Sequence, residues 1–171
     1  MTAMEQGNSG DAAAERLWDF ATTHYARGGV ARCCLQAQDE LGMDVILLLF
    51  AAWRAREGEA LHSDAFAAAE AICRPWRDAV VLPLRARRRD WKRDPPGDFE
   101  YAAIKQLELQ AERAQLEMLA QRRDASITAT PGTDVPAPDY AALLRSNLRA
   151  LCRHYGAADD ALAALQAALL S

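Results

Sequence analysis

Hydrophobic and polar positions follow one another along most of this chain with the period of an amphipathic α-helix. In the segment 11–27, Leu17, Phe20, Ala21 and His24 stand at offsets of 3, 4 and 7, which place them on one helical stripe. Similar stripes recur in segments that glycine and proline separate. The pattern predicts helices over 11–27, 30–41, 45–56, 64–74, 76–92, 98–123 and 140–155, and a last helix through Leu162, Leu165 and Leu169.

One segment is apolar on every side instead of on one stripe. Nine apolar residues run without interruption from Val45 to Trp53. Nine helical residues span about 14 Å, which is too short for a hydrocarbon core of about 30 Å. Asp44 fits an N-cap because its carboxylate can accept the free amide hydrogens of the next turn, and Gly42 fits the left-handed position after the preceding helix. We therefore expect residues 44–56 to form the buried central helix of a bundle.

Prolines and polar residues set the other boundaries. Ser63 or Asp64 is expected to cap the fourth helix, and Pro75 is expected to interrupt it because proline lacks an amide hydrogen. Pro83 lies inside the next helical segment and predicts a kink or a short break there. The sequence Pro95-Pro96-Gly97 predicts a stop, after which Asp98 can cap the following helix.

The longest predicted helix spans 98–123, about 39 Å at the usual rise per residue. One of its stripes has the alternating spacing of a coiled-coil seam, and Leu109 and Leu116 begin a second stripe. A helix that is apolar on two sides is expected to pack on two neighbours, and the seam also allows self-association through helix 98–123. The seam consists of Ile104, Leu107, Ala111, Ala114 and Met118.

Composition agrees with these periodicities. The 171-residue chain is 51% apolar and 26% charged, which is ordinary for a globular domain. Alanine and leucine dominate the periodic segments and favour helix over strand. The predicted fold is all-α: a single bundle of about seven to eight helices. We expect a disordered tail at 1–10, the helical bundle domain at 11–123, a flexible linker at 124–138, and a C-terminal helical hairpin at 139–171 that either docks on the bundle or binds elsewhere.

Charge is distributed unevenly. The formal net charge of -4 argues against general nucleic-acid binding. The segment 74–93 nevertheless has a local balance of +6, whereas 39–70 has -5. Three interpretations of the basic helix compete: a solvated face neutralised by the chain's own acidic helices, a docking face for an acidic protein, and a contact with RNA phosphates. The candidate partner-binding residues are Arg85, Arg88, Arg89, Trp91 and Lys92.

Four polar residues are candidates for a site inside the bundle: Asp19, His24, Asp44 and Arg77. Each also has a structural interpretation, as an ion pair or solvent-facing group for Asp19, a boundary histidine for His24 and a helix cap for Asp44. No Ser-His-Asp or Cys-His order and no glycine-rich phosphate loop is visible, so we assign no catalytic residue and no cofactor. The acidic group around Asp44 lacks the second paired motif of a magnesium site, so no metal is expected.

The four cysteines form no C-x-x-C pair and are expected to be small buried apolar residues. Because no signal peptide or membrane-length apolar segment is visible, we expect a protein of the reducing cytoplasm with no membrane contact.

The segment Leu17–Trp53 reads LWDFATTHYARGGVARCCLQAQDELGMDVILLLFAAW. It resembles the opening of a family of short bacterial hypothetical proteins, a domain of unknown function with the pattern LWDF…LQ…G.DV.LLLF..W. Ile46 stands here where that family usually has Asn. A PWR…PLR..RR element follows at 75–88, and a K..EL.AE element at 105–112. The resemblance covers Leu17–Leu119 and implies an all-helical cytoplasmic protein without implying an activity.

These observations favour a non-enzymatic cytoplasmic adaptor or regulatory protein that acts by protein–protein contact, with an unknown partner of acidic character. The runner-up is an RNA- or ribosome-associated factor that uses the basic helix 74–93. A third alternative is an enzyme with its site inside the bundle.

Overall fold

The computed structural model describes residues 3–94, 96–121 and 139–171. Within these ranges the chain forms α-helices, one π-helix and no strand, so the predicted all-α helical bundle is confirmed. The elements are α1 (Ala3–Tyr25), α2 (Gly28–Leu41), α3 (Val45–Arg56), α4 (Ser63–Trp76), the π-helix η1 (Arg77–Val81), α5 (Leu82–Arg93), α6 (Asp98–Gln121), α7 (Tyr140–His154) and α8 (Ala163–Leu170).

Helix α3 is the centre of the molecule, as its apolar sequence predicts. Its residues from Val45 to Ala55 are all buried, and the helix contacts α1, α2, α4, α6 and α7. Burying a side chain such as Phe50 contributes about 1.5–3 kcal/mol relative to leaving it in water. Asp44 caps the helix, because its Oδ1 accepts a hydrogen bond from the Ile46 amide at 2.9 Å. Gly42 has the predicted left-handed conformation, with φ of 66°.

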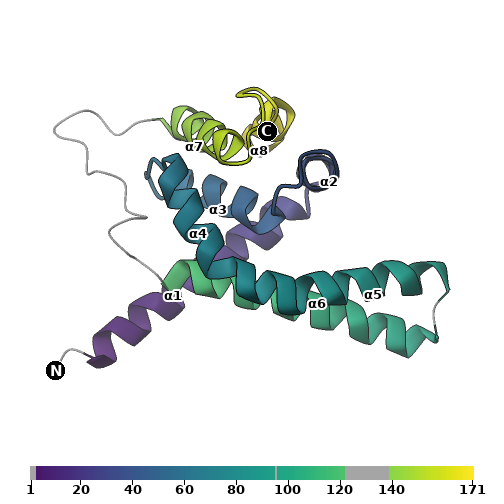
Figure 1. Cartoon of the computed structure of the whole chain (residues 1–171). Helices are drawn as coiled ribbons and strands as arrows, with labels where there is room; N and C mark the ends of the chain where they lie inside the picture. Colours follow the sequence, from purple (N-terminus) through teal and green to yellow (C-terminus); the bar gives the residue numbers. More distant parts are fainter. Residues whose placement is uncertain (1–2, 95, 122–138) are drawn as a thin grey trace.

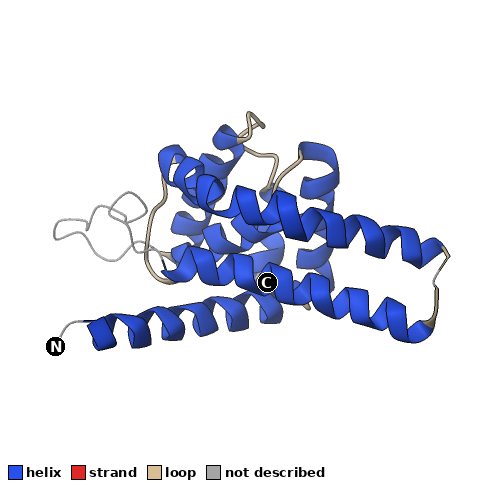
Figure 2. Ribbon diagram, turned by 60° about the horizontal axis from the view of Figure 1, so that its bottom comes forward, coloured by secondary structure: helices blue, strands red, loops and turns tan. Residues whose placement is uncertain are grey.

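Helices α5 and α6 lie side by side and extend beyond the other helices as an arm (Figures 1 and 2). The inner part of α6 packs along α1 and also contacts α3 and α4. No residue of α5 is fully buried. Helix α5 is therefore covered on one side only, by α6 and, at the base of the arm, by the body of the bundle.

The C-terminal hairpin docks on the bundle. Helix α7 packs against α3 and α4, and α8 packs against α2 (Figure 1). Leu144 and Leu165 belong to the same buried core as α3. The fully buried Asn147 donates hydrogen bonds at 3.0 Å to the carbonyl of Ala51 and also to that of Glu59. The alternative of a hairpin that binds elsewhere on a tether is thus wrong for this structure; the predicted linker 124–138 lies outside the described residues.

The fourth and fifth predicted helices are continuous, so the interruption expected at Pro75 is wrong. Helix α4 passes through Pro75 to Trp76 and leads through η1 into α5. In η1 the amide of Leu82 donates to the carbonyl of Arg77, immediately before Pro83, which has no amide hydrogen to donate. A π-helical turn holds one residue more than an α-helical turn and is often found at functional sites. Pro83 itself lies in the first turn of α5, which follows η1 without a gap, so the helical segment has no break at Pro83.

The buried face of α6 differs from both predicted stripes. Leu107 and Leu109 are 50% and 43% exposed, and thus neither stripe is continuous. The buried residues instead include the polar Glu108 and Gln115 beside Ile104 and Ala111. Partners from α1, α3, α4 and α5 surround this helix and decide which residues are covered. The expected packing of helix 98–123 on two sides is therefore correct. The residue assignment holds for Ile104, Ala111 and Leu116 and is wrong for Leu107 and Leu109.

Two helix starts also differ from the predictions. Helix α4 begins at Ser63 with His62 at the N-cap position and no side-chain hydrogen bond, so neither Ser63 nor Asp64 caps it. The preceding residue, Leu61, is held by Asn147 of α7, whose Oδ1 accepts from the Leu61 amide at 2.7 Å. Helix α1 begins at Ala3 instead of near Asp11, so residues expected as a disordered tail are helical.

Candidate functional site

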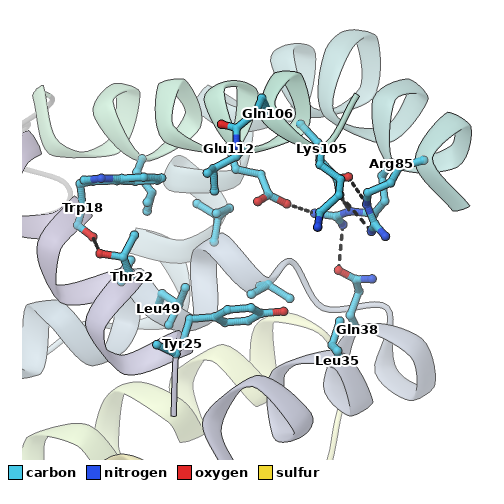
Figure 3. Close-up of a pocket in the computed structure, with 18 of the residues that line it drawn as sticks. Trp18, Thr22, Tyr25, Leu35, Gln38, Leu49, Arg85, Lys105, Gln106 and Glu112 are labelled. Atoms are coloured by element: carbon cyan, nitrogen blue, oxygen red, sulfur yellow. Dashed lines mark hydrogen bonds and ion pairs between the residues drawn. The ribbon is translucent and has the colours of Figure 1, made fainter. Parts of the chain in front are cut away.

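A cleft at the base of the arm is lined by residues of α1, α2, α3, α5 and α6 and has a volume of about 480 Å³ (Figure 3). This volume lies within the range of about 300–1,000 Å³ that is typical of ligand sites. We refer to this hollow as the cleft. Its lining residues are Trp18, Ala21, Thr22, Tyr25, Ala26, Leu35, Gln38, Val45, Ile46, Leu49, Arg85, Arg88, Arg89, Lys105, Gln106, Glu108, Leu109, Glu112 and Leu116.

The floor of the cleft is apolar because the amphipathic helices α1 and α6 meet the wholly apolar α3 there. Leu49 of α3 and Leu116 of α6 are almost fully buried beneath it. Leu35 of α2 and Leu109 of α6 also line it, yet they are 45% and 43% exposed. Large apolar side chains thus remain accessible to solvent inside a concave surface.

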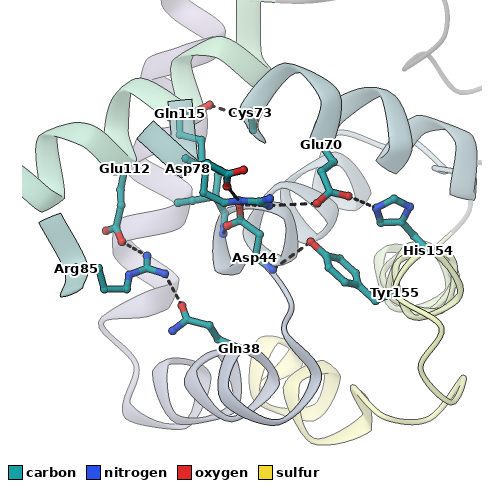
Figure 4. A network of polar contacts seen from close by, with 12 residues as sticks. Gln38, Asp44, Glu70, Cys73, Asp78, Arg85, Glu112, Gln115, His154 and Tyr155 are labelled. Carbon is teal, nitrogen blue, oxygen red and sulfur yellow. Dashed lines mark hydrogen bonds and ion pairs between the residues drawn. The ribbon is translucent and has the colours of Figure 1, made fainter. Parts of the chain in front are cut away.

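Arg85 organises the charged wall of the cleft. Its Nε donates to Glu108 at 3.2 Å, and its two Nη atoms donate to Gln38 at 2.8 Å and to Glu112 at 2.6 Å (Figures 3 and 4). These contacts join α5 to α6 and α2. Arg85 was predicted as an exposed partner-binding residue, but its side chain is only 13% exposed. Its guanidinium group is therefore part of the scaffold of the cleft.

Arg88 is held in the same way. It forms a bidentate ion pair with Glu108, in which Nε and Nη2 of Arg88 each donate to one carboxylate oxygen. Glu108 is 6% exposed. Such paired geometry suits the planar guanidinium fork. Burial raises the pKa of Glu112 above its ordinary value of 4.5, although the hydrogen bond and positive charge of Arg85 oppose that shift. Within the basic segment 74–93, Arg85 and Arg88 are thus neutralised by carboxylates of α6, which the sequence did not indicate. Arg77 and Arg89 pair with the acidic segment 39–70, as expected.

The remaining basic residues of the arm are directed to solvent. Arg89 is exposed and contacts Asp39 only at 3.5 Å, and Lys92 is exposed as well. Trp91 is half-buried, with the guanidinium group of Arg87 5.9 Å from its ring centroid. Lys105, on the α6 side of the cleft, is also exposed, and the described residues offer it no ion pair. Of the predicted basic group, Arg89 is thus the residue that combines exposure with a place at the cleft.

A second group of polar residues lies next to the cleft and is referred to as the cap cluster: Asp44, Glu70, Arg77, Gln115, His154 and Tyr155. Figure 4 labels all of them except Arg77. At its centre, the Asp44 carboxylate accepts hydrogen bonds from the Gln115 amide at 2.7 Å and from Arg77 at 3.4 Å. The Asp44 side chain is 5% exposed. One carboxylate therefore caps α3 and ties it to η1 and α6.

The other half of the cap cluster joins the C-terminal hairpin to the rest of the bundle through hydrogen bonds. Glu70 accepts from Arg77 at 3.3 Å and lies 2.7 Å from Nε2 of His154. The Asp44 amide donates to the Tyr155 hydroxyl at 3.2 Å. Burial raises the pKa of Tyr155 to about 12. Burial opposes ionisation of Glu70, but hydrogen bonds from His154 and Arg77 outweigh it and lower the Glu70 pKa below 4.5.

Asp44, Glu70 and Arg77 also line a second hollow of about 410 Å³, which shares Arg85 and Arg89 with the cleft. The three carboxylates around it, including Asp39, balance its three arginines. In the part of the chain that the structure describes, no three histidine, cysteine or carboxylate side chains converge in a way that could hold a metal ion.

The four-residue polar site considered from sequence is not assembled. Asp44 and Arg77 meet in the cap cluster, but Asp19 is exposed on α1 and lines neither hollow. His24 lies 2.8 Å from the carbonyl of Phe20, stacks on the Phe20 ring at 4.0 Å, and likewise lines neither hollow. Burial lowers the His24 pKa below 6.5. A structural role therefore accounts for His24, and Asp19 is solvent-facing.

The sequence interpretation missed Glu108, Glu112, Gln115 and Asn147. A signal was present, because Ile104, Glu108, Ala111 and Gln115 follow one another at helical intervals of four, three and four. A polar residue at a core-facing position is a candidate for a buried hydrogen-bonded group. The spacing does not reveal its partner, because Arg85 and Arg88 come from another helix.

The family model for "Protein of unknown function (DUF2390)" matches residues 16–119, and the chain therefore belongs to this family. The match includes every residue that lines the cleft and leaves out α7 and α8. No curated protein matches the chain, and no solved structure matches it either. Among the described residues, no helix combines the length and the apolar character that crossing a membrane requires.

Proposed function

We propose that this member of the DUF2390 family is a non-enzymatic adaptor or regulatory protein, and that it acts by holding an acidic, partly apolar segment of a protein partner in the cleft. The observation that carries the proposal is the combination of accessible apolar side chains and exposed cations in one concave surface. The apolar side chains are Leu35 and Leu109. The exposed cations are Lys105, which forms no ion pair with a described residue, and Arg89, whose ion pair with Asp39 at 3.5 Å is itself exposed to solvent.

The apolar floor supports protein contact because such contacts gain most of their free energy from a few buried side chains. Trp18 and Tyr25 are half-buried at the α1 side of the cleft (Figure 3). Aromatic residues are enriched where one partner's anchor enters the other's surface. The ordered wall formed by Arg85 reduces the rearrangement that binding requires.

The charges support an acidic partner. Four cationic side chains line the cleft against two carboxylates, and the two carboxylates are already bound by Arg85 and Arg88. The positive excess at Arg89 and Lys105 would steer an acidic segment toward the cleft and disfavour a basic one. The RNA alternative is weaker because Arg85 and Arg88 are paired within the chain.

We also propose that the contact takes place in the cytoplasm. Cys33, Cys34, Cys73 and Cys152 are all free thiols, which suits a reducing compartment. Self-association through helix α6 is retained as a further proposal, since Leu107 stays 50% exposed on that helix.

Photo-crosslinking in cells tests the adaptor proposal. A photoreactive amino acid is placed at Leu35 or Leu109 inside the cleft, and at Leu170 as a control with the same 43% exposure as Leu109. Leu170 is at the end of α8 and lines neither hollow. We expect a discrete protein adduct from positions 35 and 109 that position 170 does not give. Identical products from all three positions, or none from the cleft, would refute the proposal.

A further inference from the structure

We infer that the segment held in the cleft is an amphipathic α-helix with acidic residues along one flank only. This inference rests on the proposed function and specifies the conformation and the charge pattern of the partner. It follows from three features of the cleft: the hydrogen-bonding capacity of its walls, the placement of charge on one wall, and the state of each cation there.

The walls offer no backbone hydrogen bonds to a guest. The cleft is built from helices, whose amide and carbonyl groups are paired within each helix. No strand edge exists in the described residues, so strand addition has no template there. An extended segment on the apolar floor would leave its own backbone groups unpaired, which is costly. A helix satisfies its backbone internally and presents only side chains, so it is the conformation that this surface accepts.

Charge lies on one wall only. The α1 and α2 side presents Trp18, Thr22, Leu35 and Gln38, all uncharged, whereas Arg85 and Lys105 come from the α5 and α6 side (Figure 3). A helix that lies across the cleft and inserts its apolar side chains into it therefore meets cations on one flank and neutral groups on the other. The complementary partner helix has an apolar stripe with carboxylates along one side of that stripe.

The two kinds of cation have different roles. Arg85 is engaged by three partners and Arg88 by a bidentate ion pair, so both shape the wall. Arg89 is 53% exposed with a single contact at 3.5 Å, and Lys105 lies exposed along the α6 side. Lys105 lies 5.8 Å from the Tyr101 ring centroid and has no ion pair with a described residue. Both residues can meet carboxylates of a bound helix without breaking the contacts that join α5 to α6, and only the exposed ion pair of Arg89 with Asp39 is exchanged.

Synthetic peptides test this inference on the full-length protein. Three fluorescent peptides of about 18 residues, or five helical turns, share length and leucine content. The first has leucines at helical spacing with glutamates on one flank, the second alternates the same residues with a period of two, and the third replaces glutamate by lysine. We expect the first to bind on the order of tenfold more tightly than the other two, with an affinity that falls as salt is added.

Charge reversal supplies the matched comparison. The variant R89E/K105E is expected to lose the preference for the acidic helix and to favour the lysine peptide, whereas R145E/R149E, at exposed positions of α7, should behave as the wild type. The inference is overturned if the alternating peptide binds as tightly as the helical one, if no helical peptide binds, or if R89E/K105E leaves the preference unchanged.

The peptide-binding experiment and the crosslinking experiment can fail independently, so a failure of the helix inference is distinguishable from a failure of the adaptor proposal. Adducts from positions 35 and 109 together with equal binding of the alternating peptide would leave the protein contact intact and remove the helix. Absence of adducts would remove the contact itself. If the crosslinked segment of the partner proves to be extended or basic, the inference is likewise wrong.

Discussion

Replacing Asp44 by alanine probes the junction at which the described helices α3, α6 and η1 are tied together. The substitution removes the acceptor for the Ile46 amide, which by itself costs about 1 kcal/mol for a typical N-cap. It also leaves Gln115, a residue with no exposed surface, without an acceptor for its amide at a cost of about 1–3 kcal/mol. Arg77 is less affected, because Glu70 and Asp78 remain 3.3 and 3.1 Å away.

Taken together, these losses predict that D44A lowers the free energy of unfolding by about 3 kcal/mol. In a chain of this length that corresponds to a fall in melting temperature of roughly 6–12 °C. The assay is urea unfolding followed by circular dichroism. D44N retains an acceptor for the cap and is expected to cost about half as much. D19A, at an exposed carboxylate of α1, serves as the control and should stay within about 0.5 kcal/mol. If D44A is no more destabilising than D19A, the cap cluster does not hold the helices as we describe.

Three further outcomes are expected. N147A should lower the free energy of unfolding in urea by about 2–4 kcal/mol, because it leaves the Leu61 amide and the carbonyls of Ala51 and Glu59 without their hydrogen-bond partner. A loss below about 1 kcal/mol would argue against that role. The depressed pKa of Glu70 stabilises the fold above pH 4.5, and this contribution is lost as the pH falls through the folded value, so E70Q should flatten the acid limb of a stability–pH profile; an unchanged limb would contradict it. Thiol alkylation of the native protein at pH 8, followed by mass spectrometry, should label the half-buried Cys33 first. Labelling should be slow at Cys34 and Cys73, whose pKa burial raises to about 12, and at the fully buried Cys152. Equal labelling of all four cysteines without denaturant would contradict the fold.

The sequence predicted helix boundaries correctly at positions where the residue type has one dominant structural role. Helix α3 has its predicted bounds, Val45–Arg56, because an N-cap aspartate and an unbroken apolar run leave few alternatives. Gly42 was predicted for the same kind of reason, since a left-handed residue after a helix is most often glycine. A resemblance to a family of unknown function was also inferred from residue patterns over Leu17–Leu119, and the matching family model covers residues 16–119.

The candidate site was only partly accessible to sequence reasoning. Asp44 and Arg77 were singled out, and they do meet, at 3.4 Å. Arg85 and Arg88 were expected on a binding face, yet both are turned toward carboxylates of the neighbouring helix. Helical spacing fixes which side of its own helix a residue occupies, but it does not fix what another helix brings to that side.

The sequence by itself determined the helical class, the buried position of α3, and the place of the basic helix, because all three follow from periodicity and composition within one segment. Only the tertiary structure decided that the C-terminal hairpin docks on α3 and α4, that α4 continues through Pro75, and that the arginines and carboxylates of the arm neutralise each other around an apolar cleft. Those outcomes depend on contacts between residues far apart in the chain. Hydrophobic burial is non-directional, so the apolar pattern says that a face is covered but not by which partner.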